Sequence, residues 1–397
     1  MRREHKLLNR LSTEARLLLL TAGPDRTNAE IAELLRHRTV DWEALIELAD
    51  RERATAILWR RVRPHVPSSI PDAIRERMER MAMVADFSAS YLEARVGETL
   101  AHIEREGGTA IVLKGTALAS SVYPSFFERP MGDIDLLVDV SHADALWQSV
   151  QSIGWRWDED RYPSRLYVGH HHLAPLADGR VLDVRLELHT ALFVPGSPFL
   201  LDTAELRRDA ERRAIGKGHA MVPSREHLLL HACIHFTWSH MMNFGSWRAF
   251  RDVVALTASG IDWSRFEEQA KRNRAESSCY WTFRLAERLV GAELPPDTMS
   301  RLKRSTDERW VGLCERHVVG EIFRAENRCP SLWLRRLLWE RAIQPERAEH
   351  GEVRPWMLDD LAPENMDPEH TEGGVVRAAR HLSRVGAWYR YARALFS

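Results

Sequence analysis

The chain has 397 residues, of which 44% are hydrophobic and 28% are charged, and its formal net charge is −1. This composition is ordinary for a globular protein and excludes a wholly disordered chain, while the length indicates two or three domains. The balanced charge excludes a chain-wide attraction for nucleic acid or for an anionic membrane, so such a partner would need a local basic patch.

The cysteines and the apolar segments indicate the compartment. Cys233, Cys279, Cys314 and Cys329 lie far apart and form no C-x-x-C pair. This spacing argues against a zinc ribbon or a disulfide scaffold and is typical of a reducing compartment. Residues 17–20 are too short for the apolar part of a signal peptide, and no stretch approaches 18 apolar residues. We therefore expect a cytoplasmic protein without a transmembrane segment.

The first 105 residues predict helices. Apolar residues recur at three- and four-residue spacing in segments 30–35, 41–49 and 73–106. Asp41 is placed to cap or favour the first turn of the second segment. Gly107 and Gly108 are expected to end the long third helix.

The pattern changes at Thr109. Strands are expected at residues 110–113 and 133–140, each followed by a helix, at 115–122 and 141–153 respectively. Segments 166–173 and 181–188 then predict a β-hairpin around the turn residues Asp178 and Gly179. In that register His170 lies opposite Glu187 and His172 opposite Arg185, unless a bulge at Pro175 shifts the pairing by one residue.

From about residue 201 the chain is expected to be helical again. Ser224 and Asp262 open predicted helices, and segments 276–293 and 331–342 are amphipathic. Residues 351–374 predict an acidic linker or surface loop, and 375–396 an arginine-rich amphipathic helix. That helix would dock on the body of the protein, or bind RNA, a membrane surface or a partner. The predicted domains are 1–105 (helical), 106–200 (α/β), 201–350 (helical) and 351–397 (linker and terminal helix).

Two carboxylates carry the strongest functional signal. Asp133 and Asp135 stand at positions i and i+2 of an otherwise apolar strand, so they point to the same face. Paired carboxylates are typical ligands of Mg²⁺, whose other positions are filled by water and substrate phosphates. Upstream, Gly115 and Thr116 would let the backbone and a hydroxyl approach a phosphate. The pattern indicates metal-dependent chemistry on a nucleotide, although two solvated acids at a strand end would have the same spacing.

These motifs resemble the nucleotidyltransferase superfamily, in which a Gly-[Gly/Ser/Thr] turn precedes an Asp-h-[Asp/Glu]-h strand. More narrowly, Leu113-Lys-Gly-Thr116, Arg129-Pro-Met-Gly-Asp-Ile-Asp135 and Glu187-Leu-His189 resemble the bacterial "nucleotidyltransferase family protein" group, the fifth-type NTP-transferase family. The resemblance extends over roughly residues 25–290. It implies an α+β fold, with a small mixed-sheet nucleotidyltransferase core between helical N-terminal and C-terminal regions.

The resemblance also implies roles for individual residues. Asp133 and Asp135 match the metal-ligand pair, and Glu187 matches the third carboxylate, which in the family is more often aspartate. Asp183, on the same predicted face, is the substitute for Glu187. The residues implied to bind the nucleotide are Lys114, Gly115, Thr116, Arg129 and Gly132.

Two of these cations have alternative interpretations. Lys114 would neutralise phosphate charge, or would be an exposed lysine at the end of a strand. Arg129 would contact the triphosphate, or would be exposed to solvent in a turn before Pro130. Arg248 and Asp252, four residues apart, predict an ion pair on a helix surface.

The histidines are interpreted mainly as structural or substrate-contacting residues. A strand would place only two of His170, His171 and His172 on one face, without a cysteine or close acid to complete a zinc site. His170, His172 and His189 are expected to support the carboxylates, with His170 orienting Glu187. Along the chain His227, His231 and His235 recur every four residues and predict helix packing rather than a metal pair.

The expected activity is transfer of a nucleoside monophosphate from an NTP to a hydroxyl or phosphate acceptor, with Mg²⁺ or Mn²⁺ as cofactor and ATP as the expected NTP. The acceptor, whether a small molecule, a peptide or protein, or a sugar, is not specified by the sequence. One alternative is an inactive nucleotide-binding regulatory protein. Another is a helical interaction scaffold whose basic terminal helix holds a partner or RNA.

Overall fold

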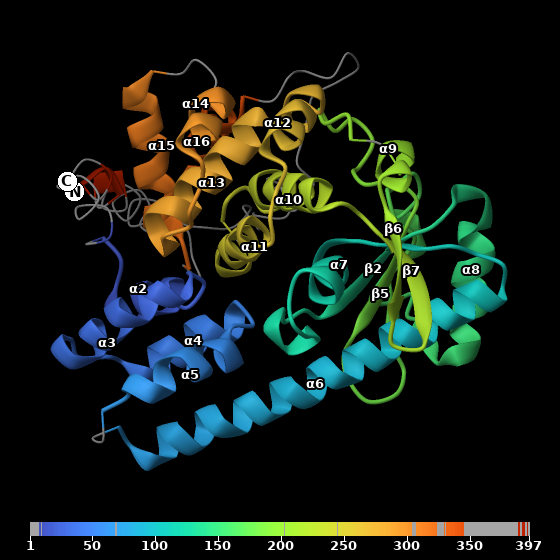
Figure 1. Cartoon of the computed structure of the whole chain (residues 1–397), viewed down its shortest axis with the longest axis horizontal. Helices are drawn as coiled ribbons and strands as arrows, with labels where there is room; N and C mark the ends of the chain where they lie inside the picture. The colour runs from blue at the N-terminus through green and yellow to red at the C-terminus, as the bar shows by residue number, and fades with distance from the viewer. Residues whose placement is uncertain are drawn as a thin grey trace, which may run out of the picture.

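The computed structural model describes residues 10–344, with gaps at 68–69, 202, 244, 304–306, 324–328 and 330, together with residues 8, 388–389, 391–393 and 395. A mixed seven-stranded sheet lies beside two groups of helices (Figure 1). One group precedes the sheet in the sequence and the other follows it. This arrangement confirms the predicted α+β fold. No described helix is long and apolar enough to cross a membrane.

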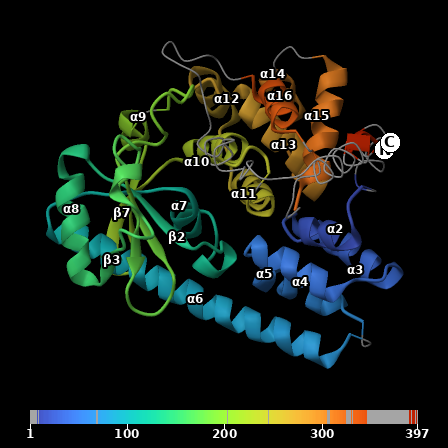
Figure 2. The same ribbon diagram turned by 180° about the vertical axis from the view of Figure 1, so that it is seen from behind.

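The N-terminal helices follow the predicted pattern. They are α2 (Thr13–Leu20), α3 (Asn28–His37), α4 (Trp42–Arg51), α5 (Thr55–Val62) and α6 (Asp72–Arg105). The predicted cap at Asp41 is confirmed, because its carboxylate accepts a 3.1 Å hydrogen bond from the backbone N–H of Ala44. Figures 1 and 2 show α6 running from these helices to the sheet, where it packs on β6 and β7. It ends just before Gly107, whose φ of 75° suits glycine.

The sheet has the strand order β3-β4-β5-β2-β1-β7-β6. Its strands are β1 (Ile111–Val112), β2 (Asp133–Leu137), β3 (Trp155–Trp157), β4 (Leu176–Asp178), β5 (Arg185–His189), β6 (Glu211–Ile215) and β7 (Gly218–Val222). At its centre β2 runs parallel to β5, with Asp135 opposite Glu187. Side chains alternate along a strand, so the apolar residues of both strands point to the face opposite these acids. Those residues, Ile134, Leu136, Leu186 and Leu188, are fully buried.

The predicted hairpin has a different register. β4 and β5 are joined by residues 179–184 rather than by a two-residue turn, and Leu176 lies opposite Leu186. His172 lies opposite His189 and not Arg185, so the predicted pairing of His170 with Glu187 is also wrong. Between these two pairs, three residues on one side oppose two on the other, which is a bulge that contains Pro175. The bulge shifts the pairing by one residue. The rest of the difference from the predicted register comes from the six-residue connection between the strands.

The sheet continues past residue 200, where only helices were expected. β6 and β7 form a hairpin around Gly216, which has a φ of 57°, and β7 adds to the sheet parallel to β1. The first four residues of β6 are exposed, so the strand lacks the apolar alternation that reveals a half-buried strand. The predicted strand 133–140 ends earlier, at Leu137, and β3 was not predicted.

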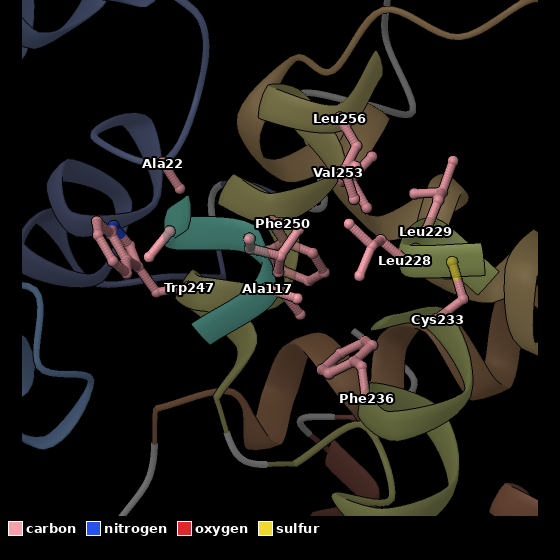
Figure 3. Close-up of a cluster of buried hydrophobic side chains, with 14 of the residues drawn as sticks. Ala22, Ala117, Leu228, Leu229, Cys233, Phe236, Trp247, Phe250, Val253 and Leu256 are labelled. Carbon is pink, nitrogen blue, oxygen red and sulfur yellow. The ribbon is translucent and has the colours of Figure 1, made fainter. Parts of the chain in front are cut away.

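The remaining helices join the sheet to the C-terminal region. α7 (Lys114–Ser121) packs on α10 (Arg225–Ile234), while α8 (Ala143–Ser149) contacts β5. Figure 3 shows Ala117 of α7 among apolar side chains of α10, α11 (Ser246–Ala258) and the π-helical turn His235–Ser239. The others are α9 (Thr203–Arg208), α12 (Trp263–Arg272), α13 (Glu276–Val290), α14 (Pro296–Leu302), α15 (Glu308–Glu321) and α16 (Leu332–Ile343). One continuous core therefore fixes the start of α7 beside the central strands.

The acidic linker predicted at 351–374 lies outside the described residues, as does most of the predicted terminal helix. Of that helix, Tyr391 and Leu395 are buried against the C-terminal helices. The hydroxyl of Tyr391 lies 3.0 Å from Nδ1 of His317 on α15. The division into four domains stays a prediction.

Candidate active site

Three carboxylates meet on one face of the two central strands. Asp133 and Asp135 project from β2, and Glu187 projects from β5 beside Asp135 because the strands are parallel and in register. The side chain of Asp135 is 3% exposed and that of Glu187 14%, while that of Asp133 is 40% exposed. The sequence-predicted acids are thus brought together, with Asp135 at the bottom of the group and Asp133 toward solvent.

Lys114 and His189 both bind the deepest carboxylate. The ammonium of Lys114 donates to Oδ1 of Asp135 at 2.7 Å, and Nε2 of His189 lies 2.9 Å from the same oxygen. Lys114 is the first residue of α7 and has a φ of 45°, a left-handed conformation that is costly for a residue other than glycine. Lys114 is therefore not an exposed lysine at the end of a strand, because its ammonium is bonded to Asp135 among the three acids.

The surroundings move the carboxyl pKa values in opposite directions. Burial and the charges of Asp135 and Glu187 raise the pKa of Asp133. Burial would also raise the pKa of Asp135, but Lys114 and the hydrogen bond from His189 outweigh it and hold that pKa well below its usual range. Burial is likewise outweighed at Glu187, where His189 lowers the pKa. The fold therefore stabilises the charge on two acids and opposes it on Asp133.

Two arginines that the sequence did not assign to the site lie near Asp133. The guanidinium of Arg53, from the turn after α4, packs over Gly132, where an added Cβ would lie 2.3 Å from Nη1. Arg248 of α11 is close enough to Asp133 and Arg53 for their charges to act on its pKa, which burial lowers. Neither arginine has an ion-pair partner among the described residues. No sequence pattern assigns either of them to the carboxylates.

Other predicted residues occupy different positions. Thr116 is buried and its hydroxyl lies 3.7 Å from Sδ of Met131. A Cβ on Gly115 would lie 3.2 Å from the same sulfur, so glycine permits this close approach. A phosphate role for Gly115 and Thr116 stays a prediction and would depend on the backbone amides. Asp183 is not brought to the carboxylates, because it precedes β5 and forms an exposed pair with Arg161 at 3.0 Å.

Arg129 is buried and paired, so the alternative that it is exposed to solvent is wrong. Its Nε and Nη2 donate to the two carboxylate oxygens of Asp252 at 2.6 and 2.8 Å, and Nη1 donates to the carbonyl of Pro130. The hydroxyl of Tyr123 also donates to Asp252 at 2.8 Å. The predicted surface pair of Arg248 with Asp252 is consequently wrong. Arg129 instead ties the segment before β2 to α11, and its donors are engaged there rather than free for a triphosphate.

The histidine run lies in a turn beside β5 and not in a regular strand. The ring centres of His170, His171 and His172 lie 4.2–4.8 Å apart, so all three rings gather on one side. Burial lowers the pKa of each, that of His172 to about 4. His227 fits the predicted packing role, because it is buried and bonded to Ser224 and Gln269.

The donor set fits a hard divalent cation. Asp135, Glu187 and His189 offer ligand atoms that all lie within 4.8 Å of one another, and Asp133 adds a further carboxylate on the same face. Carboxylate oxygens are the ligands that Mg²⁺ prefers. Burial and then the charges of Asp135 and Glu187 raise the pKa of Asp133, and a cation bound here would offset the repulsion among the three acids.

The sequence matches one family model, described as "Uncharacterised nucleotidyltransferase", over residues 38–291. The chain belongs to this family. No curated protein matches the sequence. The matched region of this nucleotidyltransferase family member contains the carboxylates, Lys114, both unpaired arginines and the Arg129–Asp252 pair. Nucleotidyltransferases act on nucleoside triphosphates, which agrees with a site where carboxylates meet cations.

Proposed function

We propose that the protein is a Mg²⁺-dependent nucleotidyltransferase that transfers a nucleoside monophosphate from an NTP to a hydroxyl or phosphate acceptor. The observation that carries this proposal is the parallel pairing of β2 with β5, which sets Asp135 beside Glu187 with Asp133 on the same face. ATP is the expected NTP, and Mn²⁺ could replace Mg²⁺.

Asp133, Asp135 and Glu187 would hold the metal. Bound Mg²⁺ supplies charge stabilisation for the attacking and leaving oxygens of an in-line phosphoryl displacement. The chain's own residues prepare the site for it. His189 and Lys114 keep Asp135 ionised, and His189 lies between Asp135 and Glu187, at 2.9 Å and 3.6 Å respectively. The ligand oxygens are therefore held in place before a metal binds.

The cations would bind the triphosphate. Arg53 and Arg248 reach the edge of the site from two helical regions, next to the most exposed carboxylate, Asp133. Arg185 joins them at 3.6 Å from Asp133. Guanidinium groups bind phosphate oxygens through paired N–H donors, so Arg53 and Arg248, which have no ion-pair partner in the part of the chain that the structure describes, support a polyanionic substrate.

A labelled-NTP assay tests the proposal. The protein is incubated with [α-³²P]ATP, Mg²⁺ and cell extract, and the labelled product is identified. Label should be transferred by the wild type and not by a D133N/D135N variant. Labelling that the double variant retains would contradict the proposal. ATP-dependent thermal stabilisation without any transfer would instead support an inactive nucleotide-binding regulatory protein.

A further inference from the structure

A second cluster of metal-ligating side chains lies next to the carboxylates. It consists of His170, His171 and His172, whose nearest ring nitrogens all lie within 4.8 Å of one another. Its donors are imidazoles, whereas those of the carboxylate site are mainly oxygens. Imidazole suits Zn²⁺, Cu²⁺, Ni²⁺ and Fe²⁺, and oxygen ligands suit Mg²⁺. The two clusters therefore differ in the cation that they would select.

The backbone presents the three rings before any ligand binds. The N–H groups of Thr190 and Ala191 both donate to the carbonyl of His171, at 2.9 and 3.1 Å, which anchors the turn just after β5. On its other side, Leu173 donates to the carbonyl of Leu188 at 3.0 Å. The turn bends at Gly169, which has a φ of 72°. These bonds bring three consecutive side chains to one side, which a regular strand cannot do.

Several ring nitrogens are left without a bond. Nδ1 of His170, of His171 and of His189 is buried and has no hydrogen-bond partner among the described residues. Buried polar groups are normally bonded, so three unpartnered nitrogens in neighbouring rings call for a ligand. The ring of His189 lies 5.2 Å from that of His171 and 5.1 Å from that of His172, so all four rings form one group.

His172 is already set in the tautomer that a metal requires. Its Nδ1 lies 2.8 Å from the carbonyl oxygen of Leu173, which can only accept, so Nδ1 carries the proton. Nε2 then has a free lone pair. Histidines that bind zinc commonly donate their other ring N–H to a backbone carbonyl or carboxylate in this way.

We propose that His170, His171 and His172 form a second metal site, which binds a divalent transition-metal ion of the Zn²⁺ class. Three histidine ligands leave a fourth position of a tetrahedral ion for water or another ligand. Zn–N bonds of about 2.0–2.1 Å require the rings to approach slightly through side-chain rotation. Binding would fix the turn against the end of β5 and add positive charge near Glu187, which is close enough for its charge to act on His170 and His172.

The test is Zn²⁺ titration of the metal-free full-length protein against a chromogenic chelator, with H170Q, H171Q and E187Q variants. The wild type should bind Zn²⁺ tightly in the presence of excess Mg²⁺. H170Q and H171Q should each lower the affinity for one equivalent of Zn²⁺ by at least about tenfold. Even replacing a residue that only hydrogen-bonds to a metal ligand costs that much. E187Q should retain this equivalent. His37→Gln is the matched control, because His37 is exposed at the end of α3.

Wild-type affinity in both H170Q and H171Q would overturn the proposal, as would loss of the equivalent in E187Q alone. Co²⁺ substitution gives a second measurement, because the visible absorption of imidazole-bound Co²⁺ should appear in the wild type and vanish in H171Q. Circular dichroism of each variant verifies that it is folded. All measurements omit nucleotide, so they do not depend on whether the carboxylate site is active.

Discussion

Two groups of charged side chains meet residues 129–135, which lead into β2 and form its start, and they are built in opposite ways. At Arg129 and Asp252 one cation meets one anion through two hydrogen bonds, and Tyr123 adds a third. At Asp133, Asp135 and Glu187 three acids share two permanent cations, Lys114 and Arg185, and the imidazole of His189. In the first group the side chains hydrogen-bond to one another and to the protein backbone. The second keeps Asp133 at its exposed edge with a raised pKa, and perturbed carboxyl pKa values cluster at functional sites.

The pKa values of the carboxyls in the second group also differ from one another. Asp135 is stabilised as an anion, while the pKa of Asp133 is raised by burial and by its neighbours. A fold selected only for stability has no reason to keep a carboxylate that its surroundings oppose. This difference between the groups predicts that substitutions in one will affect activity and in the other stability.

The largest effect should come from Asp133. D133N removes a proposed metal ligand, so the rate of transfer should fall by at least about 100-fold. Replacing a residue that only hydrogen-bonds to a metal ligand typically costs less than this. The free energy of unfolding should stay unchanged or rise, because asparagine removes an opposed charge. Transfer assays and urea unfolding measure the two effects. D183N is the matched control, since Asp183 is exposed and paired with Arg161. Full activity in D133N would show that Asp133 is not needed for transfer, and the proposed role of the carboxylate group would be wrong.

Arg129 should show the reverse. R129A leaves Asp252 buried without its partner, which should lower the free energy of unfolding by about 3–5 kcal/mol. Urea unfolding of R129A and of the R129M/D252L double variant measures this. The double variant should recover most of the loss, because it removes both charges and refills the space. Equal losses in the two variants would mean that packing, and not charge pairing, dominates there.

His231 of α10 shows a third way to bury a titratable group, by keeping it neutral. Burial lowers its pKa from 6.5 to about 3. Because the folded pKa lies below the unfolded one, the stability is present above pH 6.5 and is lost as the pH falls from 6.5 toward 3. The loss should reach about 2 kcal/mol at pH 5, at about 1.4 kcal/mol per pH unit.

H231L cannot be protonated and should lack this part of the acid sensitivity. Unfolding midpoints at pH 7 and pH 5 test it against the wild type and an H37L control on the surface. The gap between wild type and H231L should close or reverse at the lower pH. A gap independent of pH would show that His231 is hydrated or can move.

The smallest effect should come from the two unpaired arginines. R53A and R248A should each raise KM for the NTP by about tenfold, which corresponds to roughly 1.4 kcal/mol of a charge-assisted contact. Stability should change little in R53A, because Arg53 has no ion-pair partner among the described residues. It should fall somewhat in R248A, because the charge of Arg248 acts favourably on the buried carboxyl of Glu52. R36A, on the exposed side of α3, is the control. An unchanged KM in both variants would assign the phosphate contacts to Arg185, Lys114 and the backbone.

Much of the fold follows from local patterns. Helix caps at Asp41, Ser224 and Asp262 are confirmed, because a side chain three residues before a backbone N–H is a local arrangement. The alternation in β2 places Asp133 and Asp135 together for the same reason. The register of β4 with β5 was missed because it depends on a six-residue connection and a bulge. The β6–β7 hairpin was missed because β6 is exposed and charged.

The sequence by itself determined the elements that carry the two aspartates, and their shared face. Only the tertiary structure brought Glu187 beside Asp135 while leaving Asp183 outside, since that depends on where β5 begins. It also buried Arg129 against Asp252, which stands 123 residues away. Likewise it placed Arg53 and Arg248 near the carboxylates. Side-chain period is set by the local backbone, whereas the pairing of distant charges is decided by how strands and helices pack.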